Sequence, residues 1–316
     1  MLRFPTQPVL HSGAPGILLA GLCFITGGSA FLTNHHADEE NVVAITASAG
    51  DFQAPDTIPS GWTTLRLQNL GAGEIHEISL ARLPDESTFE EYRDDVIPVW
   101  EQVNRQIKSV ELGPDELSEY LRSHLPGWYS EVQWVHSRGL LSYGRTADNT
   151  VYLEPGVYSL ESWLKTKDGE LYLSRGLLRE MVVTDETSGD LPPTISDVRI
   201  QLTDSLVTME DTLKQGRRRI SVRLADGALG RPMNLHLIRI KPDTDPDEVA
   251  RWMEWYDADG LRSPEPAQFL GGFATYGRDA EDDTIHFTVD VDAPGDYAWI
   301  VGAPVPNPFW HVFTVN

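Results

Sequence analysis

From residue 42 onward, short hydrophobic runs alternate with polar positions and are separated by turn-forming residues. The run VVAITASAG alternates in steps of two, which is typical of a strand with one buried face. Further strand candidates are WTTLRLQNL, HEISLARL, TVYLEPGVYSLESWL and REMVVT. Short strands at this spacing, punctuated by turn signals, predict an all-β sandwich.

A segment rich in Asp, Ser, Gly and Pro interrupts the strand pattern at residues 185–197. This composition is typical of a domain boundary. Beyond it the same order of strand candidates returns, as RRISVRLAD, NLHLIRI, TIHFTVDVDAPGDYAWIVG and HVFTV. The pattern therefore predicts two domains, at residues 42–184 and 195–316, joined by a linker at 185–194.

The two predicted domains also match in sequence, which indicates an internal repeat. The segment SYGRTADNTVYLEPGVYSL at 142–160 matches TYGRDAEDDTIHFTVDVDAPGDYAWI at 275–300. Likewise SLARLPDESTFEEYRDD matches HLIRIKPDTDPDEVARW, and in each case a strand ending in Arg and an aliphatic residue leads through Pro to a helix start. Each domain is thus expected to carry a helical excursion.

The excursion is longer in the first domain. Its PDELSEYLRSHL segment places Leu117, Leu121 and Leu125 at i, i+4 and i+8, the apolar stripe of a short helix. In the second domain Asp245 is the expected N-cap and Pro246 lies in the first helical turn.

The N-terminus contains an apolar run, GILLAGLCFITGGSA at residues 16–30. Its length and its small residues predict a signal peptide at 1–30 followed by a linker at 31–41, with no transmembrane segment in the mature chain. The single cysteine, Cys23, lies in LAGLC, which resembles a lipoprotein box except that Leu22 stands where a small residue is required, so a lipid anchor stays an alternative. We expect export to the periplasm, the cell envelope or the medium, without disulfides.

Charge narrows the choice of partners. The 316-residue chain has 48 acidic and 25 basic residues, a formal net charge of −23. Phosphate binding needs clustered Lys and Arg, and the one basic run, at 217–219, is expected to lie on the solvent face of a strand. Nucleic acid is therefore not an expected partner.

An ordered set of short motifs runs through the first domain: Phe-x-Ala-Pro-x-x-Ile-Pro-x-Gly at 52–61, then Asn69-x-Gly71, His76-Glu77, Leu-x-Arg-Leu at 80–83 and Pro-Gly-x-Tyr at 155–158. This set, found again in the second domain, resembles cupredoxins, and most closely exported bacterial proteins with tandem cupredoxin-like domains. The resemblance implies an all-β fold of two tandem Greek-key β-sandwiches, each with a helical excursion.

The resemblance also implies where copper ligands would lie. A type 1 copper site uses two imidazoles, a thiolate and a weak axial thioether. The resemblance places His76 at the first His position, Ser162 at that of the Cys, Tyr172 at that of the second His and Leu177 at that of the Met. In the second domain it places Met233, Val301 and Phe309 at ligand positions, with His311 nearby. No cysteine lies in the predicted mature chain, so neither type 1 copper nor another cofactor is expected.

A metal site without thiolate stays an alternative. His76, followed by Glu77, and His136 in WVHSRG could hold copper or zinc with a non-standard ligand set. The other interpretation is that these histidines are hydrogen-bonded structural residues at the rim of the sandwich.

No enzyme motif is present. The chain has no G-x-S-x-G elbow, no HExxH and no phosphate-binding glycine loop, so we expect no catalytic residues. Nine tryptophans are available either to clamp the excursions onto the sandwiches or to form an aromatic surface, and Trp252 and Trp255 share one helix face. The sequence therefore predicts a non-catalytic binding or structural protein with a protein or glycan partner in the cell envelope; the alternative is a copper- or zinc-binding envelope protein.

Overall fold

The computed structural model describes residues 41–48, 50–109, 114–135, 137–188, 195–225, 227–228, 231–276, 284–302 and 308–316. The predicted signal peptide, Cys23 and His136 lie outside the described residues. Glu40–Asn316 is one compact unit. Within it, residues 42–184 are called the first half and residues 195–316 the second half.

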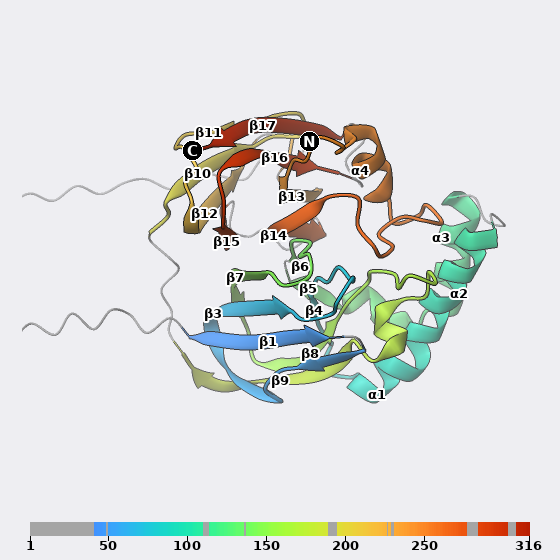
Figure 1. The fold of residues 1–316 in the computed structure, drawn as a ribbon. Helices are drawn as coiled ribbons and strands as arrows, with labels where there is room; N and C mark the ends of the chain where they lie inside the picture. The colour runs from blue at the N-terminus through green and yellow to red at the C-terminus, as the bar shows by residue number, and fades with distance from the viewer. Residues whose placement is uncertain are drawn as a thin grey trace, which may run out of the picture. The chain divides into compact units, whose positions relative to one another are not determined.

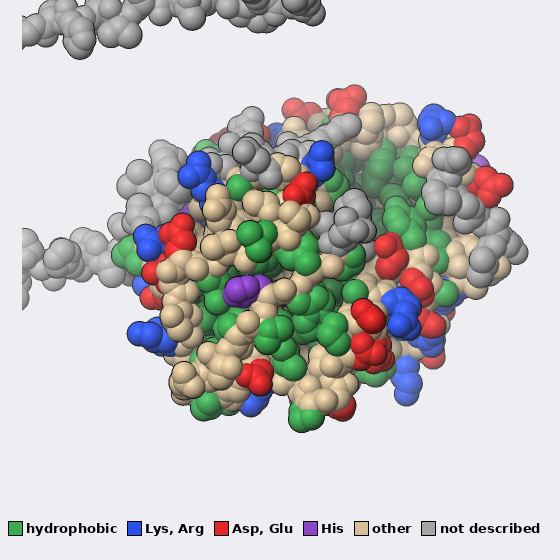
Figure 2. Space-filling model, turned by 90° about the horizontal axis from the view of Figure 1, so that it is seen from above, with side chains coloured by type: hydrophobic (Ala, Val, Ile, Leu, Met, Phe, Trp, Pro, Cys, Tyr) green, Lys and Arg blue, Asp and Glu red, His purple; other side chains and the backbone are tan. Residues whose placement is uncertain are grey.

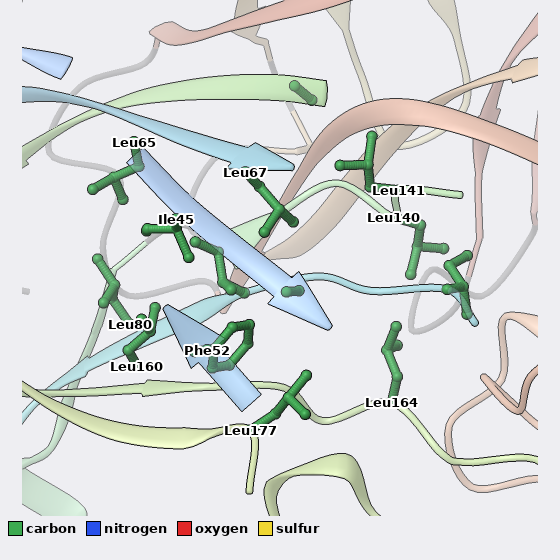
Figure 3. Close-up of a cluster of buried hydrophobic side chains, with 14 of the residues drawn as sticks. Ile45, Phe52, Leu65, Leu67, Leu80, Leu140, Leu141, Leu160, Leu164 and Leu177 are labelled. Carbon is green, nitrogen blue, oxygen red and sulfur yellow. The ribbon is translucent and has the colours of Figure 1, made fainter. Parts of the chain in front are cut away.

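The first half consists of two sheets. One contains β1 (Val42–Ser48), β2 (Asp51–Gln53), β3 (Thr57–Asn69) and β7 (Thr146–Leu153), and the other contains β4 (Ser79–Arg82), β5 (Gln133–Val135), β8 (Gly156–Glu161) and β9 (Leu178–Thr187). The start of β3 also pairs with β9, which connects the two sheets. Figure 3 shows the buried side chains between them, including Ile45, Phe52 and Leu160.

The predicted helical excursion of the first half lies between β4 and β5. It contains α1 (Phe89–Glu91), a π-helical turn at Tyr92–Val96, α2 (Ile97–Ser109), α3 (Pro114–His124) and a 3-10 turn at Gly127–Glu131. Thr88 and Glu91 form a capping box that starts the first helix. The helix expected from the leucine stripe is confirmed as α3, and Leu117 is buried.

The second half repeats this organisation. One sheet contains β10 (Val198–Leu202), β11 (Val207–Met209), β12 (Gly216–Leu224) and β15 (Thr284–Val291), and the other contains β13 (Pro232–Arg239), β14 (Gln268–Tyr276), β16 (Gly295–Val301) and β17 (Phe309–Val315). The excursion is the short α4 (Pro246–Trp252), where Asp245 caps the helix by accepting from the Asp247 N–H, as predicted.

Strand pairing repeats in the same register. In both halves the first strand runs parallel to the third, and the strand that carries the Arg runs antiparallel to the strand that carries the Tyr. Arg82 is opposite Tyr158 as Arg239 is opposite Tyr297. Each Tyr hydroxyl donates to the backbone carbonyl four residues before it, at 2.9 Å for Tyr158 and 2.7 Å for Tyr297. The repeat read from the sequence is therefore present in the register of the strands.

The two halves are joined along their sheets (Figure 1). β7 pairs antiparallel with β15, and the two-residue strand β6 (Ser137–Arg138) pairs with β14. Side chains from the second half, including Ile238, Phe269 and Ile300, lie in the hydrophobic core of the first half. This continuity makes residues 40–316 one unit, and the boundaries of the two domains stay a prediction.

Candidate functional site

The His76 backbone is fixed by the turn that follows β3. The Asn69 side chain donates to the Glu74 carbonyl at 2.9 Å and to the Leu141 carbonyl at 2.8 Å, and it accepts from the Gly71 N–H at 2.9 Å. His76 then exchanges two backbone hydrogen bonds with Leu141, at 3.1 and 2.9 Å. The Asn-x-Gly motif thus aims the His76 side chain into the interior.

The His76 ring is buried, and its nitrogens make no hydrogen bond to the described residues. Its exposed fraction is 0%, and among the described residues neither Nδ1 nor Nε2 has a hydrogen-bond partner. Oε2 of Glu74 lies 3.5 Å from Nε2. Burial lowers the pKa of His76 to about 4, so the imidazole is neutral near pH 7, and burial raises the pKa of Glu74.

The other three predicted positions come together on the loop of residues 162–177. Ser162 N–H donates to the Leu177 carbonyl at 3.1 Å, Leu173 N–H donates to the Ser162 carbonyl at 3.1 Å, and Leu177 N–H donates to the Tyr172 carbonyl at 3.1 Å. The Tyr172 ring packs edge-to-face on His76, with ring centroids 4.9 Å apart. The structure therefore places Tyr172 beside His76 and joins it to Ser162 and Leu177 through this loop.

At the positions that the resemblance assigns to ligands, the side chains do not provide the donors of type 1 copper. Ser162 supplies a buried hydroxyl without a hydrogen-bond partner among the described residues, and Leu177 points into the same hydrophobic cluster as Phe52 and Leu164 (Figure 3). Neither replaces the thiolate or the thioether of such a site. Within the described parts of the chain, no group of three or more His, Cys, Asp or Glu side chains is arranged to hold a metal. His136, the predicted partner of His76 in a metal site, lies outside the described residues.

A buried carboxyl pair adjoins this loop. Glu161 has no exposed surface and accepts from Tyr92 Oη at 3.2 and 3.1 Å, from Ser159 Oγ at 3.1 Å and from Trp163 Nε1 at 2.9 Å. Glu77 is also buried and accepts from the Trp163 backbone N–H. Burial raises the pKa of Glu77 to about 8, with a further rise from the nearby Glu161, and burial raises the pKa of Glu161 to about 7.

Sequence reasoning missed the importance of Glu161 and treated Glu77 only as a neighbour of His76. Glu161 ends β8, where both strand faces are buried from Tyr158 onward. A burial pattern of this kind depends on the helical excursion and on the second half, which local alternation does not reveal. The arrangement therefore buries two carboxyls whose pKa values are raised by desolvation.

The 162–177 loop is also tied to the second half. Lys165 has an exposed fraction of 0%, and its Nζ donates to the carbonyls of Trp255 at 2.7 Å and Asp257 at 2.8 Å. The Tyr172 hydroxyl is 3.0 Å from Ser263 Oγ, which accepts from the Ile75 N–H at 3.3 Å. Burial lowers the pKa of Lys165 to about 8.

The tryptophans near this loop attach the helical excursions to the sandwiches. α4 ends at Trp252, so the expectation that Trp252 and Trp255 share a helix face is wrong. Trp255 Nε1 donates to the Trp163 carbonyl at 2.9 Å, and Trp252 Nε1 donates to the Arg262 carbonyl at 2.7 Å. Trp100 packs edge-to-face on Trp163 at 5.2 Å and on Trp255 at 5.8 Å. Of the two sequence interpretations, these contacts favour attachment of the excursions to the sandwiches over an open aromatic surface.

The corresponding positions of the second half form ordinary core. Met233 and Val301 are buried, and Val301 lies opposite Phe309, which packs on the same cluster. Asn234, the equivalent of Glu77, donates to the Gly302 carbonyl at 3.2 Å and accepts from the Gly302 N–H at 2.8 Å. His311 lies on β17 opposite Trp299 of β16, and in the described part of the chain β17 is an edge strand of its sheet.

Comparisons with known proteins find structural likeness only. No protein-family model matches the chain, and no curated protein matches it. Reduced auracyanin from Roseiflexus castenholzii overlaps 46% of this chain and 98% of its own, at 14% identity and a TM-score of 0.28. A multicopper oxidase overlaps 87% of this chain and 88% of its own, at 10% identity and a TM-score of 0.23. A copper-containing nitrite reductase from Thermus scotoductus overlaps 87% of this chain and 61% of its own, at 11% identity and a TM-score of 0.22.

The fold is all-β, and strand order and register repeat between its two halves, as the sequence predicts. Among the described residues, no helix has both the length and the apolar character needed to cross a bilayer.

Proposed function

We propose that this chain is an exported, copper-free binding or structural protein of the cell envelope, without enzymatic activity. One observation carries the proposal: the loop that resembles a copper-ligand loop is used to attach the second half. Lys165 and Tyr172 of this loop bind the 255–263 segment through three side-chain hydrogen bonds of 2.7 to 3.0 Å. Buried side chains that make these hydrogen bonds stabilise the fold and are not available to bind a metal ion.

Export and partner class are supported by the sequence. The apolar run at 16–30 supports a cleaved signal peptide or, through Cys23, a lipid anchor. The net charge of −23 disfavours nucleic acid, so the proposed partner is a protein or a glycan of the envelope.

Metal loading of the purified chain tests this proposal. The protein is incubated with Cu²⁺ or Zn²⁺, desalted, and analysed for bound metal and for visible absorption. We expect substoichiometric metal that is unchanged in His76→Ala and in the control His311→Ala, whose histidine lies on β17. One bound ion per chain that disappears in His76→Ala but persists in His311→Ala would overturn the proposal.

A second candidate function is copper or zinc binding at His76 and Glu74. It is favoured by the 3.5 Å separation of Nε2 and Oε2 and by the lack of a hydrogen-bond partner at Nε2 among the described residues. An imidazole nitrogen and a carboxylate oxygen are both zinc or copper donors. This candidate requires that Glu74→Gln and His76→Ala each abolish the bound ion in the same assay.

A further inference from the structure

The strand β17 differs from the other strands that end a sheet. Among the described residues, the sheets end in β2, β5 and β11, each of three residues, in β6 of two residues, and in β17 of seven. Short edge strands are one way in which proteins prevent pairing with another chain, because few N–H and C=O groups are left open. β17 does not use this protection.

The equivalent edge in the first half is covered. There β9 pairs on its outer side with the start of β3, which runs parallel to it with Thr57 opposite Val182 and Ile58 opposite Val183. β3 has 13 residues, whereas its counterpart β12 has nine and pairs only with β10 and β15 among the described strands. In the described parts of the second half, the extension that covers β9 therefore has no counterpart beside β17.

The composition of β17 also lacks protection against pairing. Its sequence FWHVFTV contains no Lys, Arg, Asp, Glu or Pro, and Val312 is 60% exposed. The covered strand β9 carries four charged residues: Arg179, Glu180, Asp185 and Glu186. Figure 2 views the molecule from above, the side on which β17 lies in Figure 1, and hydrophobic side chains gather in the middle of this face.

We propose that β17 is an interface through which two copies of this chain pair antiparallel, edge to edge, into a symmetric dimer. A second copy is the occupant that fits the charge distribution. Two chains of net charge −23 repel each other wherever acidic surfaces meet, whereas the strand β17 itself carries no carboxylate. One carboxylate beside it, Asp296 of β16, already accepts from Thr314 Oγ1 at 2.7 Å. A basic peptide finds no carboxylate on this strand to recognise it.

A two-fold axis near Val312 makes this strand complementary to itself. Antiparallel pairing centred there places Val312 opposite its counterpart and Trp310 opposite Thr314, so that aliphatic and aromatic groups meet across the axis. The open backbone groups of both strands then form hydrogen bonds with each other. This interface is independent of the first-half loop and of whether that loop binds metal.

Sedimentation of the full chain over a range of concentrations tests the proposal. We expect a monomer–dimer equilibrium in which Val312→Glu and Val312→Lys each raise the dissociation constant by about tenfold or more, because like charges meet at the axis in either variant. The control Leu206→Glu introduces the same charge at a residue that is 57% exposed in the turn between β10 and β11, and it should leave the constant within about twofold.

The two signs of charge separate local pairing from general repulsion. If only Glu weakens the dimer while Lys strengthens it, net charge is the cause and the proposal is wrong. A chain that stays monomeric at all concentrations, or one that is monomeric and binds an extended peptide, also overturns it. Hydrogen exchange gives a second readout, since β17 amides should exchange more slowly in the dimer than in Val312→Lys, and equal exchange contradicts edge pairing.

Discussion

The same place in the two halves is built from different side chains on the same backbone. Strand register makes His76 equivalent to Met233, Glu77 to Asn234 and Ser162 to Val301. In the second half these positions hold two apolar side chains and an amide whose oxygen and nitrogen are both hydrogen-bonded. In the first half they hold an imidazole and a hydroxyl without hydrogen-bond partners among the described residues, and a buried carboxyl.

This difference shows that the same backbone can accommodate either unpaired polar side chains or apolar side chains at these positions. A buried polar group without a partner destabilises a fold by roughly 1–3 kcal/mol, and of these equivalent positions only those of the first half carry such groups among the described residues. The second half also supplies the segment that seals them, through Ser263 and the carbonyls bound by Lys165. The polar half is thus stabilised by contacts from the apolar one.

The largest expected effect comes from exchanging the carboxyl and the amide. Glu77→Gln replaces the buried carboxyl of the first half by an amide, the group that Asn234 carries at the equivalent position of the second half. Since burial raises the Glu77 pKa from 4.5 to about 8, the folded wild type holds a proton that the unfolded chain releases, and its stability falls as pH rises through this interval. We expect the variant to gain on the order of a few kcal/mol relative to wild type at about pH 8 and almost nothing near pH 4.

Urea unfolding at several pH values measures this effect. The reciprocal Asn234→Asp should introduce a similar fall of stability with pH into the second half. Glu161, with its pKa raised to about 7, leaves a smaller slope in Glu77→Gln. A Glu77→Gln variant whose change in stability is the same at acid and alkaline pH would contradict the assignment of a protonated carboxyl.

The next effect compares the buried hydroxyl with its apolar counterpart. Val301→Thr inserts a hydroxyl of nearly unchanged shape into the second-half core and should destabilise the protein by about 1–3 kcal/mol. Ser162→Ala removes the unpaired hydroxyl from the first half and should be neutral or stabilising by about 1 kcal/mol. Chemical denaturation of both variants tests the pair, and a marked loss in Ser162→Ala would mean that its hydroxyl has a partner.

A smaller effect is expected where the first half contacts the second. Tyr172→Phe removes the hydroxyl that meets Ser263 Oγ at 3.0 Å and should lower the free energy of unfolding by about 0.5–1.5 kcal/mol. A double-mutant cycle with Ser263→Ala should give a coupling energy of similar size. Additive single effects would show that the two hydroxyls do not interact in solution.

The smallest effect at neutral pH is expected for His76→Met, which copies Met233. The His76 pKa is lowered from 6.5 to about 4 by burial, so the unfolded chain binds a proton before the folded chain does, and wild-type stability falls as pH drops through this window. We expect the variant to lie within about 1 kcal/mol of wild type at about pH 7 and to gain relative to it near pH 4. Thermal unfolding at both pH values measures this, and a variant with unaltered acid sensitivity would show that His76 does not cause it.

Much of the fold can be predicted from local pattern. Alternation, turn residues and the repeated Pro-Gly-x-Tyr motif predict the strands, and the Tyr158 and Tyr297 contacts confirm their equivalence. The leucine stripe predicts α3 and the Asp-Pro pair predicts the start of α4. These signals succeed because they depend on residues close in sequence.

The candidate site depends on residues far apart in sequence. From its sequence neighbours, Leu164 and Thr166, Lys165 would be expected to face solvent. Its ammonium group instead donates to the carbonyls of Trp255 and Asp257, which lie 90 and 92 residues away in the sequence. The pairing of β7 with β15, which merges the halves into one unit, has no local signature either. Sequence reasoning located His76, Ser162, Tyr172 and Leu177 through the resemblance, but not the segment of the second half that seals them.

The attachment of the two halves has a consequence for unfolding. Repeats that share strand pairs, a hydrophobic core and the buried Lys165 do not lose their structure one at a time, since opening either half exposes the inner surface of the other. We therefore expect a single cooperative transition, with calorimetric and van't Hoff enthalpies that agree, where a loosely tethered pair of sandwiches would give two.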